Sequence, residues 1–116
     1  MDRKTAKTLK KEVKKHFDSI KDETTIRRIF NEIDPLRKRL DKTDNNIVNA
    51  GEEMVRKSFA RNYRKQCVLD LYDILDWSVK KYSNEQTRDV TATLERVKNI
   101  NDRNFWEKLI AVFSGS

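Results

Sequence analysis

Apolar residues recur every three or four positions along most of this chain, and polar residues fill the positions between them. That spacing places the apolar side chains on one face of an α-helix. Residues 3–20 give the clearest example, and we expect them to form an amphipathic helix with its lysines in solvent. The apolar stripe of this first helix consists of Ala6, Leu9, Val13, Phe17 and Ile20.

A second predicted helix begins near Thr24 or Thr25, because threonine is a good N-cap residue. Pro35 lies inside the segment, and a proline normally ends or kinks a helix. The stripe nevertheless keeps its phase across the proline, so we expect a kink or a very tight break, with both halves packing on one surface. The apolar stripe consists of Ile26, Ile29, Ile33, Leu36 and Leu40.

The middle of the chain, residues 47–82, follows a polar loop at residues 41–46 and has no strong breaker after Gly51. Its apolar face changes direction along the way. Val48, Val55 and Phe59 point one way, and a later set points roughly the opposite way. Either the helix breaks near residues 62–66, which we favour, or one long helix packs different partners on opposite faces. The later set consists of Val68, Leu71, Leu75, Val79 and Tyr82.

Two further helices are predicted in the last third of the chain. One covers residues 85–99, and a short one follows a cap at Asn101 or Asp102. The short helix is apolar on most of its circumference, so it must be buried in its own bundle or in a partner. Its apolar residues are Phe105, Trp106, Leu109, Ile110, Val112 and Phe113, and residues 113–116 are expected to fray.

The chain of 116 residues contains only two glycines and one proline, and 39% of its residues are charged. Sheet proteins need frequent turns, and these residues make them. We therefore predict a single all-α domain over residues 1–116, a bundle of five or six helices with one long central helix as an alternative. The change of face in residues 47–82 and the apolar last helix predict a homo-oligomer.

The charge balance bears on the kind of partner. Lys and Arg number 26 against 19 Asp and Glu, for a net charge of +7, and the excess lies toward the N-terminus. Such a surface attracts nucleic acid, anionic membrane or an acidic protein. No apolar run approaches the ~18 residues of a membrane span. The single Cys67 excludes an internal disulfide, which fits a cytoplasmic protein.

Two groups of basic residues are candidates for nucleic-acid binding through phosphates. In the first, Lys57, Arg61 and Arg64 share a helical face that could follow a phosphate backbone, and Tyr63 could stack on an unpaired base. The alternative is an ordinary solvated face. The full first group is Arg56, Lys57, Arg61, Tyr63, Arg64 and Lys65, and the second is Lys4, Lys7, Lys11 and Lys14 on the first helix.

A protein-interaction surface is the second kind of candidate. Asp70, Asp73 and Asp76 recur at every third position and predict an acidic stripe, with Trp77 on the same side. Tryptophan is common at interaction hot spots, which also favours Trp106 in the last helix. The alternative is a solvent face on which Trp77 packs against a neighbouring helix.

The sequence gives little support for catalysis. The only cysteine and the only histidine, Cys67 and His16, are far apart in the chain and make a weak nucleophile pair. The chain has no glycine-rich phosphate loop and no zinc-ligand spacing, and the carboxylates of the acidic stripe lack the loop geometry of a hard-cation site. We expect no catalytic residue, no metal, no cofactor and no small-molecule substrate.

Residues 24–30, TTIRRIF, followed by a basic amphipathic segment, resemble the small helical subunit of type III CRISPR effector complexes, and residues 105–113 are loosely similar to the apolar C-terminal helix of those subunits. The resemblance implies an all-helical, non-catalytic subunit that contacts the RNA backbone.

The main functional hypothesis is a non-enzymatic protein whose basic surface contacts nucleic acid through phosphates, for example as a subunit of a nucleoprotein complex. The alternative is a protein-interaction module, such as an adaptor, a regulator or an immunity-type inhibitor. It would bind through Trp77 and the acidic stripe, or through the apolar C-terminal helix.

Overall fold

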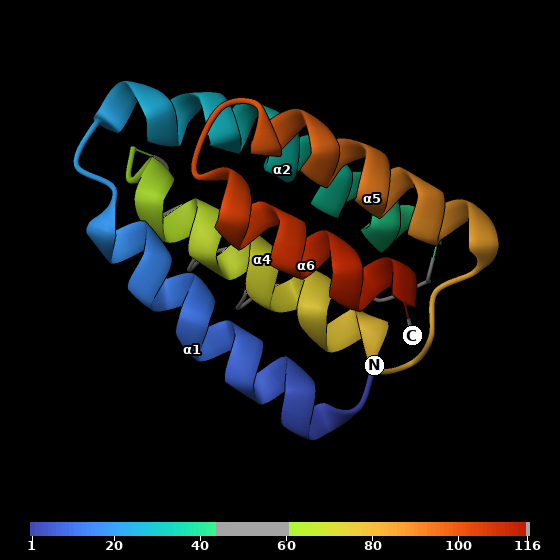
Figure 1. Ribbon diagram of the computed structural model, residues 1–116. Helices are drawn as coiled ribbons and strands as arrows, with labels where there is room; N and C mark the ends of the chain where they lie inside the picture. Colours follow the sequence, from blue (N-terminus) through green and yellow to red (C-terminus); the bar gives the residue numbers. More distant parts are fainter. Residues whose placement is uncertain (44–60, 116) are drawn as a thin grey trace.

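The computed structural model describes residues 1–43 and 61–115, and these residues form five α-helices (Figure 1). No strand occurs among them, so the all-α prediction is confirmed for the described parts of the chain. The helices are α1 (Arg3–Ser19), α2 (Glu23–Thr43), α4 (Tyr63–Ser78), α5 (Asn84–Lys98) and α6 (Arg103–Gly115).

The five helices lie roughly side by side along one direction, with α4 near the middle (Figure 1). Helix α4 packs against α1 and α2, while α5 packs against α2 and forms an antiparallel hairpin with α6. Helices α2 and α4 run the same way, and α1 runs opposite to both. The N-terminus and the C-terminus therefore lie at the same end of the bundle.

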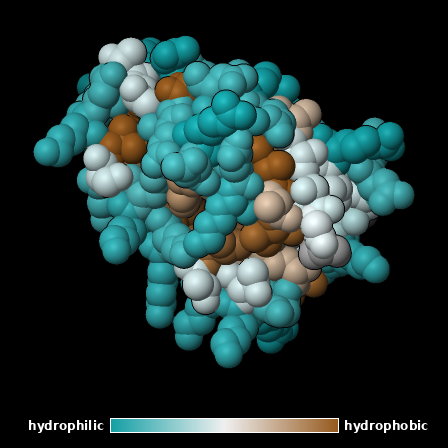
Figure 2. Space-filling view, in the orientation of Figure 1, coloured by the Kyte–Doolittle hydropathy of each residue, from teal (hydrophilic) through white to brown (hydrophobic). Residues whose placement is uncertain are grey.

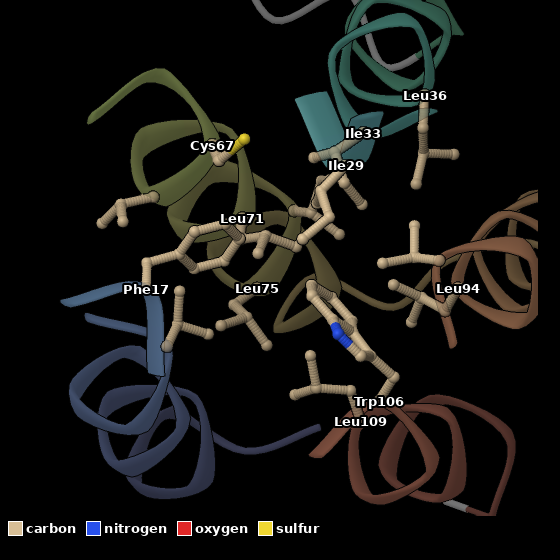
Figure 3. Close-up of a cluster of buried hydrophobic side chains, with 14 of the residues drawn as sticks. Phe17, Ile29, Ile33, Leu36, Cys67, Leu71, Leu75, Leu94, Trp106 and Leu109 are labelled. Atoms are coloured by element: carbon tan, nitrogen blue, oxygen red, sulfur yellow. The ribbon is translucent and has the colours of Figure 1, made fainter. Parts of the chain in front are cut away.

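The core forms where the predicted stripes meet. All five apolar residues of the first stripe and all five of the second are at most 8% exposed. Figure 3 shows side chains from all five helices converging, with the indole of Trp106 pointing inward between Leu75 and Leu94. Burial of each large apolar side chain contributes about 1.5–3 kcal/mol, so the stripes account for the docking of α1 and α2.

Pro35 lies within a helix that continues through it to Thr43. A break at Pro35 is therefore excluded, and both halves of the stripe pack in one core, as expected. Proline cannot donate a hydrogen bond to the carbonyl group four residues earlier, which here belongs to Asn31. Both Pro35 and Asn31 are exposed, so water can satisfy that carbonyl group, and the apolar stripe continues on the opposite side.

Polar side chains define where the helices begin. Asp22, rather than Thr24 or Thr25, caps α2: its carboxylate accepts bonds from the Thr24 amide at 3.0 Å and the Thr25 hydroxyl at 2.9 Å. These bonds, the Thr25 hydroxyl first, hold the pKa of Asp22 below its usual value. Ser83 and Gln86 form a capping box at the start of α5.

The middle helix begins at Tyr63, with Asn62 as the N-cap that accepts from the Lys65 amide at 3.1 Å. A helix start here agrees with the favoured break near residues 62–66, and the alternative of one continuous helix over residues 47–82 is wrong. Residues 47–60, including Val48, Val55 and Phe59, lie outside the described residues. Helix α6 continues to Gly115, further than the predicted frayed end.

Cys67 is fully buried on α4, and its Sγ lies 3.8 Å from the Ile26 carbonyl oxygen. Burial, followed by the nearby charge of Asp70, raises the pKa of the thiol far above its usual value. The thiolate is the reactive form, so a disulfide reagent such as DTNB should label the native protein far more slowly than the protein in denaturant. Equal rates in the two states would contradict this placement.

Candidate protein-interaction surface

The structure gives Arg64 a role inside the fold. Its guanidinium donates hydrogen bonds to the carbonyl oxygens of Phe17 and Ile20 at the end of α1, the latter at 2.7 Å, and pairs with the Glu23 carboxylate at 2.7 Å. A cation at a helix C-terminus satisfies carbonyl groups that have no partner in the helix. Arg64 thus joins α1, α2 and α4, and its guanidinium is not free for a phosphate.

The other residues of the first basic group differ in their exposure. Tyr63 is half-buried, with its ring centroid 4.9 Å from that of Phe30 and the guanidinium of Arg27 5.3 Å away. A ring held between these groups is not an open platform for a base. Arg61 and Lys65 are exposed. Arg56 and Lys57 lie outside the described residues.

The lysines of α1 remain on the surface as predicted, and Figure 2 shows a hydrophilic fringe over this helix. Lys4, Lys7 and Lys11 are exposed, while Lys14 pairs with Asp18 at 2.7 Å. Lys10, which the sequence analysis did not single out, reaches across to Asp76 of α4 at 2.6 Å. Part of the positive charge is therefore compensated within the chain.

The three aspartates of the predicted acidic stripe have three different environments. Asp70 has no exposed surface, since α4 is surrounded by other helices. Asp73 accepts from Nε of the buried Arg37 at 3.3 Å, and Asp76 is half-exposed in its pair with Lys10. These residues do not form one solvent-facing stripe, because helices α1 and α2 supply partners for two of them.

The two tryptophans also differ. Trp77 is half-buried, with the Arg37 guanidinium 5.8 Å from its ring, and it stays a predicted contact residue. Trp106 is fully buried, and its indole N–H donates to Asn101 Oδ1 at 3.0 Å. His16 Nε2 donates to the same oxygen at 2.7 Å, and its ring stacks on Phe105 with centroids 3.9 Å apart. Trp106 therefore has no surface left for a partner.

A hollow of about 350 Å³ lies at the end of the bundle where both termini meet, and apolar and polar side chains line it in equal numbers. The rings of Tyr82 and Phe113 lie 6.4 Å apart along it. Figure 2 shows further apolar surface over α6, framed by hydrophilic surface. We call this site the terminal hollow. Its apolar lining residues are Met1, Val79, Tyr82, Val112 and Phe113, and its polar ones are Ser78, Lys81, Asn84, Thr87 and Ser114.

Neither metal chemistry nor membrane insertion is indicated in the parts of the chain that the structure describes. Across residues 1–43 and 61–115, no three His, Cys, Asp or Glu side chains are grouped so that they could hold a metal ion. Among the same residues, no helix is long and apolar enough to span a bilayer.

Comparison with protein families decides which kind of binding to consider. The model of the Nnf1 family matches residues 1–109, nearly the whole chain. The chain belongs to the Nnf1 family. Nnf1 proteins are subunits of the MIS12/MIND complex of the kinetochore, an assembly held together by contacts between proteins. No curated protein and no solved structure matches the chain.

Membership in the Nnf1 family corrects two predictions. The resemblance to the small subunit of type III CRISPR effector complexes is wrong, because it rested on basic and apolar spacing that many amphipathic helices share. Nucleic-acid binding as the main function is also wrong, and the family favours the protein-interaction alternative. The internal contacts of Arg64 and Tyr63 agree with this correction.

The sequence analysis missed the terminal hollow of this Nnf1 protein. Val79 and Tyr82 were assigned to an apolar face of the middle helix, and Val112 and Phe113 to the last helix, but nothing in the spacing indicated that the two sets meet. Met1 also joins them: its Sδ lies 3.4 Å from Ser78 Oγ. The signal available in the sequence was the large number of apolar residues in the last helix.

The ground for predicting a homo-oligomer changes as well. The argument rested partly on the last helix, and two of its large side chains, Trp106 and Leu109, are buried within the chain itself. Self-association of this Nnf1 protein stays a prediction, and a protein partner is the better-supported expectation.

Proposed function

We propose that this Nnf1 protein is a non-enzymatic subunit of the kinetochore MIS12/MIND complex and that it binds partner subunits through the terminal hollow. The observation that carries the proposal is the family match over residues 1–109. Such a subunit would work in the nucleus, in contrast to the cytoplasmic location expected from the sequence.

The terminal hollow suits an amphipathic helix of a partner subunit, whose apolar side would meet the apolar half of the lining. Its apolar lining side chains are half-buried, so they keep surface that a partner can cover. Aromatic and aliphatic anchors in a concave site are typical of the residues that dominate binding energy at protein interfaces. The half-buried Trp77 on α4 is a second proposed contact, at a distinct position on the surface.

Co-expression with the other MIS12/MIND subunits tests the proposal. We expect the chain to co-elute with them in size-exclusion chromatography. The double variant Val112→Asp/Phe113→Asp should weaken the complex by about 30-fold or more, because charges would replace apolar anchors worth about 2 kcal/mol or more together.

A matched control is available on the same helix. Asn104 and Ala111 are exposed and do not line the hollow, so Asn104→Asp/Ala111→Asp adds the same charge and should change affinity by about threefold at most. Circular dichroism establishes that each variant is folded, and Phe113→Ser replaces the double variant if it is not. A folded parent that co-elutes with no other subunit would contradict the proposed function. Equal affinities of variant and control would exclude only the terminal hollow.

A further inference from the structure

A second groove lies between the first half of α1 and the end of α4, next to the terminal hollow. Its volume is about 450 Å³. It shares only Val79 with the lining of the hollow, and its character is different, because most of its side chains are cationic. We call it the basic groove, and it is lined by Arg3, Ala6, Lys7, Lys10, Asp76, Val79 and Lys80.

The basic groove has more positive than negative charge. Lys10 is neutralised by Asp76, with Nζ and Oδ1 2.6 Å apart. Arg3, Lys7 and Lys80 are exposed, and none of them has a carboxylate within ion-pair distance in the described part of the chain. Within residues 1–43 and 61–115, three cations without a carboxylate partner therefore surround one neutralised pair.

The three cations approach the groove from two sides. Arg3 and Lys7 are one helical turn apart on α1, and Lys80 comes from the turn that follows α4. Like charges this close repel each other, since screening at physiological salt acts over about 8 Å. An anionic ligand placed between the walls relieves this repulsion and gains attraction from both sides.

The floor of the groove is apolar. Ala6 is only 3% exposed, and Val79 is half-buried. None of the described residues that line the groove is aromatic, so these residues offer no surface on which a base can stack. A short groove with an apolar floor and a cationic rim matches a peptide whose carboxylates meet the rim and whose small apolar side chains meet the floor.

We propose that the basic groove binds an acidic segment of a partner protein. The choice of a protein ligand over nucleic acid rests on the proposed function. The charge and shape of the groove are observations that are independent of that function. This contact is additional to the terminal hollow: it recognises charge, whereas the hollow recognises apolar side chains.

A labelled peptide gives a direct test on the full chain. The probe is a fluorescein-labelled peptide in which glutamate alternates with alanine and valine, and its partner probe has glutamine in place of every glutamate. Fluorescence anisotropy at physiological salt should show binding of the glutamate peptide at least about tenfold tighter than of the glutamine peptide. The triple variant Arg3→Glu/Lys7→Glu/Lys80→Glu should bind the glutamate peptide at least about tenfold more weakly than the parent protein does.

The control variant makes the same change in net charge outside the groove. It should bind the glutamate peptide within about threefold of the parent, because distant charges are screened. If the reversed groove variant does not fold, the neutral variant Arg3→Gln/Lys7→Gln/Lys80→Gln takes its place. The control changes three exposed residues at the opposite end of the bundle, Lys15→Glu, Lys21→Glu and Arg28→Glu.

Three results would overturn the proposal: equal loss in the groove variant and the control, equal binding of the two peptides, or a mixed-sequence single-stranded oligonucleotide that displaces the glutamate peptide at equal concentration. Assembly with the other complex subunits is measured on the same groove variant. We expect assembly to persist through the terminal hollow, so a failure of the groove is distinguishable from a failure of the proposed function.

Discussion

Replacing Trp106 by alanine should lower the free energy of unfolding by about 3–5 kcal/mol, the range for deleting a large buried side chain. The indole has no exposed surface and packs edge-on against Phe17, with ring centroids 6.1 Å apart. The substitution leaves a cavity between α1 and α6 and removes one donor from Asn101. Urea denaturation followed by circular dichroism measures the effect.

Phe105→Ala is the matched comparison for this prediction. Phe105 neighbours Trp106 on α6 but is only half-buried, and it stacks on His16. Its loss should cost less than half as much, because less surface returns to water. A Trp106→Ala variant no less stable than Phe105→Ala would mean that α6 is not docked on the core as described.

Replacing Arg64 by alanine should lower the free energy of unfolding by about 2–3 kcal/mol. A hydrogen bond from a charged donor contributes about 1.5–3 kcal/mol, and two carbonyl groups at the end of α1 would lose this donor. The total stays near the value for one such bond, because Arg64 is 25% exposed and water can replace part of the loss. The pair with Glu23 adds little, because that carboxylate is 72% exposed. Urea denaturation again gives the value.

Arg61→Ala is the control for Arg64→Ala, since Arg61 is an exposed cation three positions earlier. Its removal should change stability by about 0.5 kcal/mol at most. Arg64→Lys should recover part of the loss, because lysine keeps the charge without the planar fork. Similar effects of Arg61→Ala and Arg64→Ala would show that Arg64 is an ordinary surface cation.

The sequence predicted the parts of the fold that depend on local periodicity. The stripes of α1 and α2 are buried without exception, since spacing along a helix determines which side chains share a face. The break before α4 was predicted from a change of face at residues 62–66, and Asn62 provides the cap. Local pattern was sufficient wherever a helix has one buried side.

Contacts between distant segments could not be predicted in this way. Arg64 caps a helix that ends 45 positions earlier in the chain, and Lys10 pairs with an aspartate on α4. Asp70 was assigned to an exposed stripe, but α4 has helices on several sides and buries it. The sequence identifies the charged residues, but the partner of each one depends on how the helices are arranged.

Both predicted classes of site were inferred from spacing along a helix, and spacing does not determine which partner a side chain contacts. Basic residues along an amphipathic helix are compatible with phosphate binding and with internal ion pairs, and periodicity does not separate the two. The apolar residues of the last helix were correctly expected to need burial, and the structure divides them between the core, at Trp106 and Leu109, and the terminal hollow, at Val112 and Phe113.

The position of the two chain ends has a mechanical consequence. Met1 contacts Ser78 at the end of the bundle where Val112, Phe113 and Ser114 also lie. A load applied between the first and last residues would peel α1 and α6 away turn by turn from that end, instead of sliding whole helices past each other. Only a few contacts would resist at any moment. A pull between Met1 and Ile20, at opposite ends of α1, would instead load that helix along its axis.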